Sequence, residues 1–171
     1  SVTIPGSVTS LGDSVFKNCT ALKSVVFNKG ATSTGICTFD GCTALESVTI
    51  ENGVTSIGAG SFSGCTALES VTIGNGVTNI GDGAFKDCAS LTSVTIPDSV
   101  TSIDNSAFYN CTSLASVTIG NGVTSIGYDV FDGCNSIKTA TINSTVAVSA
   151  FKENASIENI IIGDSVTSID N

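Results

Sequence analysis

Cysteine offers the most chemistry in this chain, and six of the seven cysteines recur at one fixed interval. Each lies 23 residues from the next: Cys19, Cys42, Cys65, Cys88, Cys111 and Cys134. Tetrahedral zinc needs ligands that converge from short spacings, so this interval argues against a metal site. The interval favours a ladder of buried thiols, each donating a weak hydrogen bond to a backbone carbonyl. Neighbours would stand ~5 Å apart, which also permits disulfides by distance, although parallel side chains suit them poorly.

Two further residues qualify the cysteine pattern. Asn154 continues the ladder after a shorter interval of 20 residues, and an amide can satisfy buried backbone groups but cannot form a disulfide. Cys37 lies outside the ladder, in a turn where other units have Ser, Gly or Asp. It could be a free, partly exposed thiol or could pair with Cys42 or Cys19. Drift within a degenerate unit is our interpretation of it.

Catalytic chemistry finds little support in the composition. The chain contains no His, so a Ser-His-Asp or Cys-His arrangement is excluded and no imidazole can activate Cys37. Paired carboxylates could in principle hydrolyse glycosides, but no acidic pair stands out from the repeat. We therefore predict that the protein is not an enzyme and uses no cofactor.

Charge and hydropathy narrow the range of partners. The 15 acidic residues against 6 basic ones give a formal net charge of −9, which argues against nucleic acid and anionic membranes. The acidic residues are scattered over turns without a calcium-binding loop pattern, so we expect a solvated acidic surface and no metal. No stretch approaches the ~18 apolar residues of a membrane span.

The repeat that places the ladder cysteines also predicts the secondary structure that positions them. Phe16, Phe39, Phe62, Phe85, Phe108 and Phe131 keep the same 23-residue interval as the ladder cysteines. The unit reads S-V-T-I-x-x-x-V-T-S-I-G-x-x-A-F-x-x-C-x-x-L-x. Seven units and a partial eighth, which begins at Asn159, fill residues 1–171 as a single domain. The first residues fall in the middle of the pattern, so we expect the chain to be part of a longer protein.

Each unit combines two periods. The segment L-x-x-V-x-I alternates as a half-buried strand does, and V-T-S-I is a second short extended piece. Phe, Cys and Leu at i, i+3 and i+6 suit one or two turns of helix or 3₁₀-helix. A single unit buries too little apolar surface to offset its conformational entropy, so neighbouring units must stack. The sequence thus predicts a β-rich repeat solenoid with short helical turns.

The strand followed by G-x-x-A-F-x-x-C-x-x-L resembles the 23-residue leucine-rich repeats of the BspA-like, Treponema pallidum-type family. Residues 84–91, A-F-K-D-C-A-S-L, show the pattern in full, and the resemblance covers the whole chain. It implies parallel strands on a concave face. It also implies an extracellular or cell-surface location and a role in adhesion to proteins or cells.

The outward positions of the first strand form the candidate binding face. In leucine-rich repeats this surface usually binds the partner, here a protein or a glycan. A structural rod assembled by end-to-end stacking of copies is the alternative hypothesis. Ranks of threonine also suit ice binding, but a serine column and a concave sheet fit a flat lattice poorly. The candidate residues are Ser47, Ser70, Ser93, Ser116, Thr49, Thr72, Thr95, Thr118, Thr141, Glu46, Glu69 and Thr92.

Overall fold

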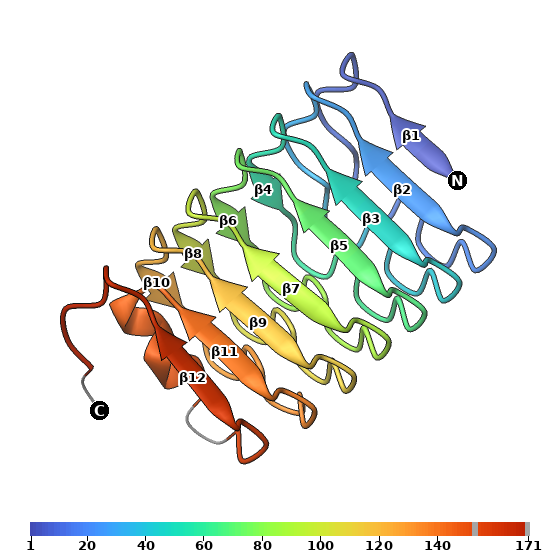
Figure 1. Cartoon of the computed structure of the whole chain (residues 1–171). Coiled ribbons are helices and arrows are strands. Elements are labelled where there is room, and N and C mark those ends of the chain that lie inside the picture. The colour runs from blue at the N-terminus through green and yellow to red at the C-terminus, as the bar shows by residue number, and fades with distance from the viewer. Residues whose placement is uncertain (152–153, 170–171) are drawn as a thin grey trace.

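The computed structural model describes residues 1–151 and 154–169, with Val148 described by its backbone alone. The end of the predicted eighth unit, Asp170 and Asn171, lies outside these residues. One long strand per unit forms a row along the front of the molecule (Figure 1). These strands are β1 (Val2–Ile4), β2 (Ser24–Phe27), β3 (Ser47–Ile50), β5 (Ser70–Ile73), β7 (Ser93–Ile96), β9 (Ser116–Ile119), β11 (Thr139–Ile142) and β12 (Asn159–Ile162).

All described strand pairs are parallel, and equivalent positions of neighbouring units stand opposite each other. Ser47 pairs with Ser70 and Thr49 with Thr72, for example. From β2 to β11 the long strands keep the Val and the Ile of S-V-T-I, or their equivalents, on the inside, because successive side chains point to opposite faces. This arrangement confirms the predicted solenoid of parallel strands.

A second row of short strands lies behind the long ones (Figure 1). It comprises β4 (Ser56–Ile57), β6 (Asn79–Ile80), β8 (Ser102–Ile103) and β10 (Ser125–Ile126), which form one continuous sheet. These strands contain the Ser-Ile or Asn-Ile end of the V-T-S-I segment, with Ile turned inward. The segment therefore makes a second sheet in four consecutive units.

The Phe-Cys-Leu segments are mostly hydrogen-bonded turns and not helix. In the fourth unit, the N–H of Lys86 donates to the carbonyl of Gly83 at 3.0 Å, and that of Leu91 to the carbonyl of Cys88 at 3.1 Å. Gly83 and Asp87 have φ values of +57° and +60°. Left-handed residues four positions apart prevent a right-handed helix from propagating. In the part of the chain that the structure describes, the one helix is η1 (Thr145–Phe151), a 3₁₀-helix in the shortened unit.

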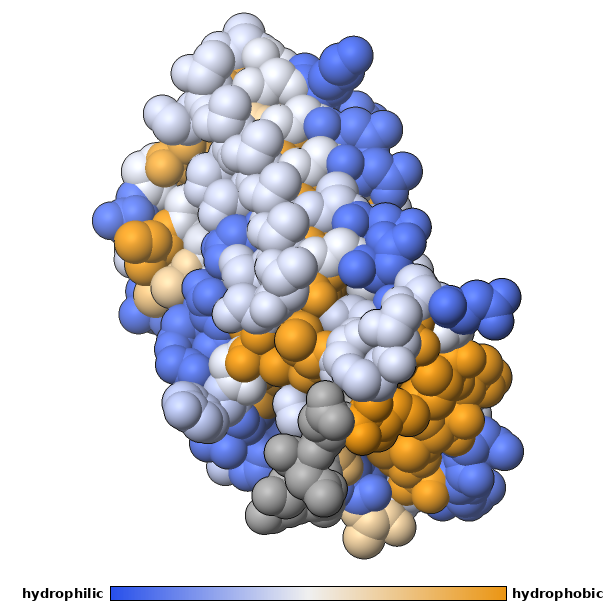
Figure 2. Space-filling view, turned by 90° about the vertical axis from the view of Figure 1, so that its left-hand side faces the viewer, coloured by the Kyte–Doolittle hydropathy of each residue, from blue (hydrophilic) through white to orange (hydrophobic). Residues whose placement is uncertain are grey.

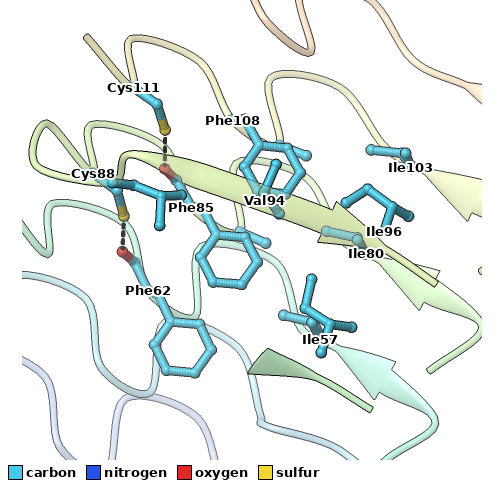
Figure 3. Close-up of a cluster of buried hydrophobic side chains, with 14 of the residues drawn as sticks. Ile57, Phe62, Ile80, Phe85, Cys88, Val94, Ile96, Ile103, Phe108 and Cys111 are labelled. Atoms are coloured by element: carbon cyan, nitrogen blue, oxygen red, sulfur yellow. Dashed lines mark hydrogen bonds between the residues drawn. The ribbon is translucent and has the colours of Figure 1, made fainter. Parts of the chain in front are cut away.

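The core is a column of stacked phenylalanines between the row of long strands and the row of short strands (Figure 3). Ring centroids are 5.3 Å apart for Phe62 and Phe85 and 5.2 Å apart for Phe85 and Phe108, with planes within 9° of parallel. The isoleucines of the short strands fill the space beside the rings. Because each ring packs on the next, burial in one unit depends on its neighbours.

The C-terminal end of the solenoid carries an apolar patch (Figure 2). Exposed apolar side chains at this end include Ile160, Ile161 and Ile162 of β12 and Ile169. Ile160 continues the column of Val25 and other inward residues, but no further turn covers it among the described residues. The positions of β12 that correspond to buried residues in other units therefore face solvent at this end.

Candidate functional site

The candidate binding residues lie together on the outward side of the long strands, which we call the strand face. Parallel pairing in register lines up the predicted serine column and the predicted threonine column. Ser70, Thr72, Ser93 and Thr95 are exposed, whereas their counterparts in neighbouring strands are mostly half-buried. Away from the two ends of the row, the most accessible part of the strand face is thus over β5 and β7.

Glu46, Glu69 and Thr92 are exposed directly before their strands and border the strand face. Glu46 pairs with Lys23 of the preceding unit at 2.7 Å. The ion pair is solvent-exposed on both sides, and such pairs contribute about 0–1 kcal/mol. These border residues place charge beside the strand face and add little to the stability of the fold.

A groove of about 850 Å³ lies on the strand face. Four candidate residues line it: Thr72, Ser93, Thr95 and Thr118. The remaining lining residues come from the strands themselves and from the turns that follow them: Val71, Ile73, Asn75, Ile96, Pro97, Asp98, Ser99, Gly120 and Asn143. The other candidates, including Ser47, Thr49, Ser116 and Thr141, lie on the strand face outside the groove.

Sequence reasoning missed the turn residues of the groove. Pro97, Asp98 and Asn143 follow strand ends, and none belongs to a threonine or serine column. Pro97 did carry a signal, because a proline at the end of a buried parallel strand removes a backbone donor. The sequence did not show that this position would border a groove.

The ladder thiols lie beneath the turns and donate to backbone carbonyls (Figure 3). Cys88 Sγ is 3.2 Å from the carbonyl oxygen of Phe62, and Cys111 Sγ is 3.2 Å from that of Phe85. The same bond recurs for Cys42, Cys65 and Cys134 at 3.1–3.3 Å. Each thiol thereby ties its turn to the unit before it.

The two ends of the ladder differ from the predicted pattern. Cys19 is exposed, contrary to its expected interior position, because no preceding turn packs against it. Asn154 Nδ2 donates to the carbonyl of Cys134 at 3.0 Å, and not to a phenylalanine carbonyl. The shortened seventh unit changes which carbonyl lies within reach of the side chain.

All seven cysteines are unpaired in the structure, and Cys37 is half-buried in its turn with φ of +49°. Burial raises the pKa of the Cys65 and Cys88 thiols well above the ordinary value. Both groups therefore stay protonated near neutral pH and act as S–H donors. A protonated, buried thiol is a poor nucleophile and a poor metal ligand.

Ser61 is the one buried side chain among the described residues whose polar atom has no hydrogen-bond partner. Ala84 and Ala107 occupy the same place in the next two units and are also buried. We expect Ser61→Ala to raise the free energy of unfolding by about 1 kcal/mol, because an unpaired buried hydroxyl loses its hydration without compensation. Urea denaturation measures the change. Ala84→Ser is the matched control and should lower stability; a destabilised Ser61→Ala would contradict the prediction.

The acidic turn residues connect neighbouring units. Asp98 Oδ1 accepts the N–H of Asn121 at 2.9 Å, and Asp13 Oδ1 accepts that of Ile36 at 3.2 Å. Across residues 1–151 and 154–169, no group of three Cys, Asp or Glu side chains is arranged to hold a metal ion. The described helix is also too short to cross a membrane.

The comparisons with known proteins agree with this geometry. The model of the BspA type leucine rich repeat region matches six copies, over residues 1–115 and 78–171. A comparison with curated proteins finds no match. Among solved structures, the leucine rich repeat protein of T. pallidum is 24% identical with a TM-score of 0.71, covering 81% of this chain and 68% of that one.

Two other solved structures share the fold. A leucine rich cell surface protein of Faecalibacterium prausnitzii is 34% identical with a TM-score of 0.57, covering 83% of this chain and 47% of that one. The pneumococcal vaccine antigen PcpA is 20% identical with a TM-score of 0.63, covering 84% of this chain and 42% of that one. The chain thus spans less than half the length of these two proteins. With the family model matched along its whole length, the chain belongs to the BspA type leucine-rich repeat family.

Proposed function

We propose that this chain is a non-enzymatic recognition module that binds a protein partner through the strand face. Solenoids offer extended surfaces built from successive turns, and repeat proteins commonly bind through them. The described residues of this face include hydroxyl, amide and carboxylate groups, but no imidazole is available to them as a catalytic base. Binding is the activity that such a surface supports best.

The observation that carries the proposal is the groove over β5, β7 and β9. Its volume of about 850 Å³ lies within the range typical of ligand sites. It combines apolar side chains, Val71 and Ile73, with hydroxyls from three successive units. Such a mixture provides both buried apolar contact and directional hydrogen bonds to a partner.

We also propose a surface-exposed or secreted location and a role in adhesion. The support comes from a relative: the Faecalibacterium prausnitzii protein is named a leucine rich cell surface protein and is 34% identical to this chain. The net charge of −9 disfavours anionic membranes and nucleic acid as partners. The remaining candidates are proteins and neutral or basic glycans.

Substituting Thr72, Thr95 and Thr118 together by Lys should weaken binding roughly tenfold or more, equivalent to at least about 1.4 kcal/mol. Three long cationic side chains would obstruct the groove while leaving the inward residues unchanged. Binding is measured on an array of purified secreted and cell-surface proteins and on an array of immobilised glycans. Each hit is then quantified by surface plasmon resonance.

The matched control is the triple Lys substitution of Thr78, Thr101 and Thr124. These residues are exposed in the same units, but they lie at the row of short strands on the other side of the solenoid. The control should retain affinity within about twofold, well under the tenfold step of 1.4 kcal/mol. Equal affinity of both variants would refute the strand face as the binding surface. Hits on glycans alone would refute a protein partner.

End-to-end stacking of copies stays a prediction. The exposed Ile160 and Ile162 of β12 are the side chains through which such stacking would bury apolar surface.

A further inference from the structure

The row of long strands is interrupted once, between β5 and β7. One sheet ends at β5 and the next begins at β7, although the two strands lie side by side (Figure 1). We call this boundary the seam. On either side of it the neighbouring long strands are paired, β3 with β5 and β7 with β9. The free edges of two parallel strands therefore face each other at the centre of the strand face.

Pro97 removes one of the backbone hydrogen bonds expected at the seam. In five other units the residue that follows the long strand donates its N–H to the carbonyl of the last strand residue of the preceding unit. Asn28 donates to Ile4 at 3.0 Å, and Gly120 donates to Ile96 at 2.9 Å. Pro97 occupies this position after β7 and has no N–H, so the carbonyl of Ile73 cannot receive the corresponding bond.

The seam opens only on the strand face. Behind it, β6 and β8 remain paired, and the rings of Phe85 and Phe108 remain stacked at 5.2 Å. Ser99 Oγ also donates to the carbonyl of Val77 at 2.7 Å, which joins the turns on either side. The interruption is therefore a local slot in the surface and not a break in the solenoid.

The groove coincides with the seam. Val71 and Ile73 of β5 both line it, and Val71 is half-buried where the equivalent Val48 and Val94 are 1% and 3% exposed. From the seam the groove continues past Thr118 to Asn143, which is two units beyond Pro97. Three strand spacings of ~4.8 Å make about 14 Å, the length of about four extended residues.

We propose that the seam anchors an extended, basic peptide segment of about four residues from the protein partner. This deepens the proposed function and rests on it. A backbone N–H of the segment, which crosses the strands, donates to the carbonyl of Ile73 that Pro97 leaves without its usual donor. An apolar side chain packs on Val71. Asp98 is the one charged residue among the described residues of the groove, so it favours a Lys or Arg in the segment.

The test uses a library of immobilised seven-residue peptides, in which each Lys-bearing peptide is matched by a Glu-bearing one. The chain should retain Lys-bearing, strand-forming peptides. Pro97→Asn should lower the affinity of the best peptide at least about tenfold, because its new N–H can donate to the carbonyl of Ile73 in place of the peptide. Asn stands at this position as Asn28 and Asn143, so the variant has a backbone conformation available to it. Asp98→Asn should also weaken binding while it keeps the oxygen that accepts the N–H of Asn121.

Pro5→Asn is the matched control. Pro5 occupies the same position in the first unit, outside the groove, and its replacement should leave peptide affinity unchanged. Hydrogen exchange provides a second measurement: amides of β5 and β7 should exchange more slowly in Pro97→Asn. Slower exchange with unchanged peptide affinity would overturn the proposal, as would unchanged exchange or the absence of any retained peptide. If the triple Thr→Lys variant loses the protein partner but Pro97→Asn does not, the strand face stands and the seam does not.

Discussion

Phe85→Ala is expected to lower the free energy of unfolding by about 3–5 kcal/mol, the usual cost of removing a fully buried aromatic ring. Phe85 has no exposed surface and stacks between Phe62 and Phe108 at 5.3 and 5.2 Å. The cavity would interrupt the column in the middle, where rings from both sides lose a partner. Guanidinium denaturation followed by circular dichroism measures the change.

Phe16→Ala provides the comparison. Phe16 is half-buried and stacks on Phe39 at 5.2 Å at the start of the column. We expect a loss below about 2 kcal/mol there, because less apolar surface is buried and the end unit can open locally. Equal losses for the two variants would show that the stack does not propagate stability along the solenoid.

Alkaline pH is expected to destabilise the protein by about 3 kcal/mol between pH 7 and 9.5 through Cys65 and Cys88 alone, at up to about 1.4 kcal/mol per thiol and pH unit. Burial raises the pKa of both thiols in the folded state. In the unfolded chain the thiols ionise near pH 8.5, whereas in the folded chain they stay protonated. Their stabilising contribution is complete below about pH 8.5 and declines as the pH rises toward the folded pKa.

Urea denaturation at a series of pH values, in the presence of a reductant, tests this dependence. The double variant Cys65→Ala/Cys88→Ala should be less stable at pH 7, because it loses two thiol bonds to the carbonyls of Phe39 and Phe62. Its stability should also fall less steeply above pH 8.5. The single variant Cys88→Ala should lie between the two. Parallel curves for all three proteins would mean that the thiols do not carry the alkaline effect.

Several features of the structure could be predicted from the sequence because they repeat. A fixed interval of 23 residues places Phe, Cys and the strand positions in columns, whatever the detailed path of the chain. Alternation within S-V-T-I then decides which side chains face inward, since a strand turns successive residues to opposite faces. The parallel strands, the buried phenylalanines and the outward Ser and Thr columns all follow from these two periods.

Features that depend on one unit and its neighbour could not be predicted in this way. Left-handed backbone at Gly83 and Asp87 makes turns where the spacing suggested helix. Cys19 has the ladder spacing but is exposed, because burial requires a turn on both sides.

The groove shows the same limit most clearly. The row of long strands is unpaired between β5 and β7, where Pro97 lacks an N–H, while the pairing of β6 with β8 holds the solenoid together behind it. The sequence by itself determined the repeat, the core columns and the outward columns, because these depend on local periodicity. Only the tertiary structure decided where the strand face opens, because that depends on which backbone groups of adjacent turns meet.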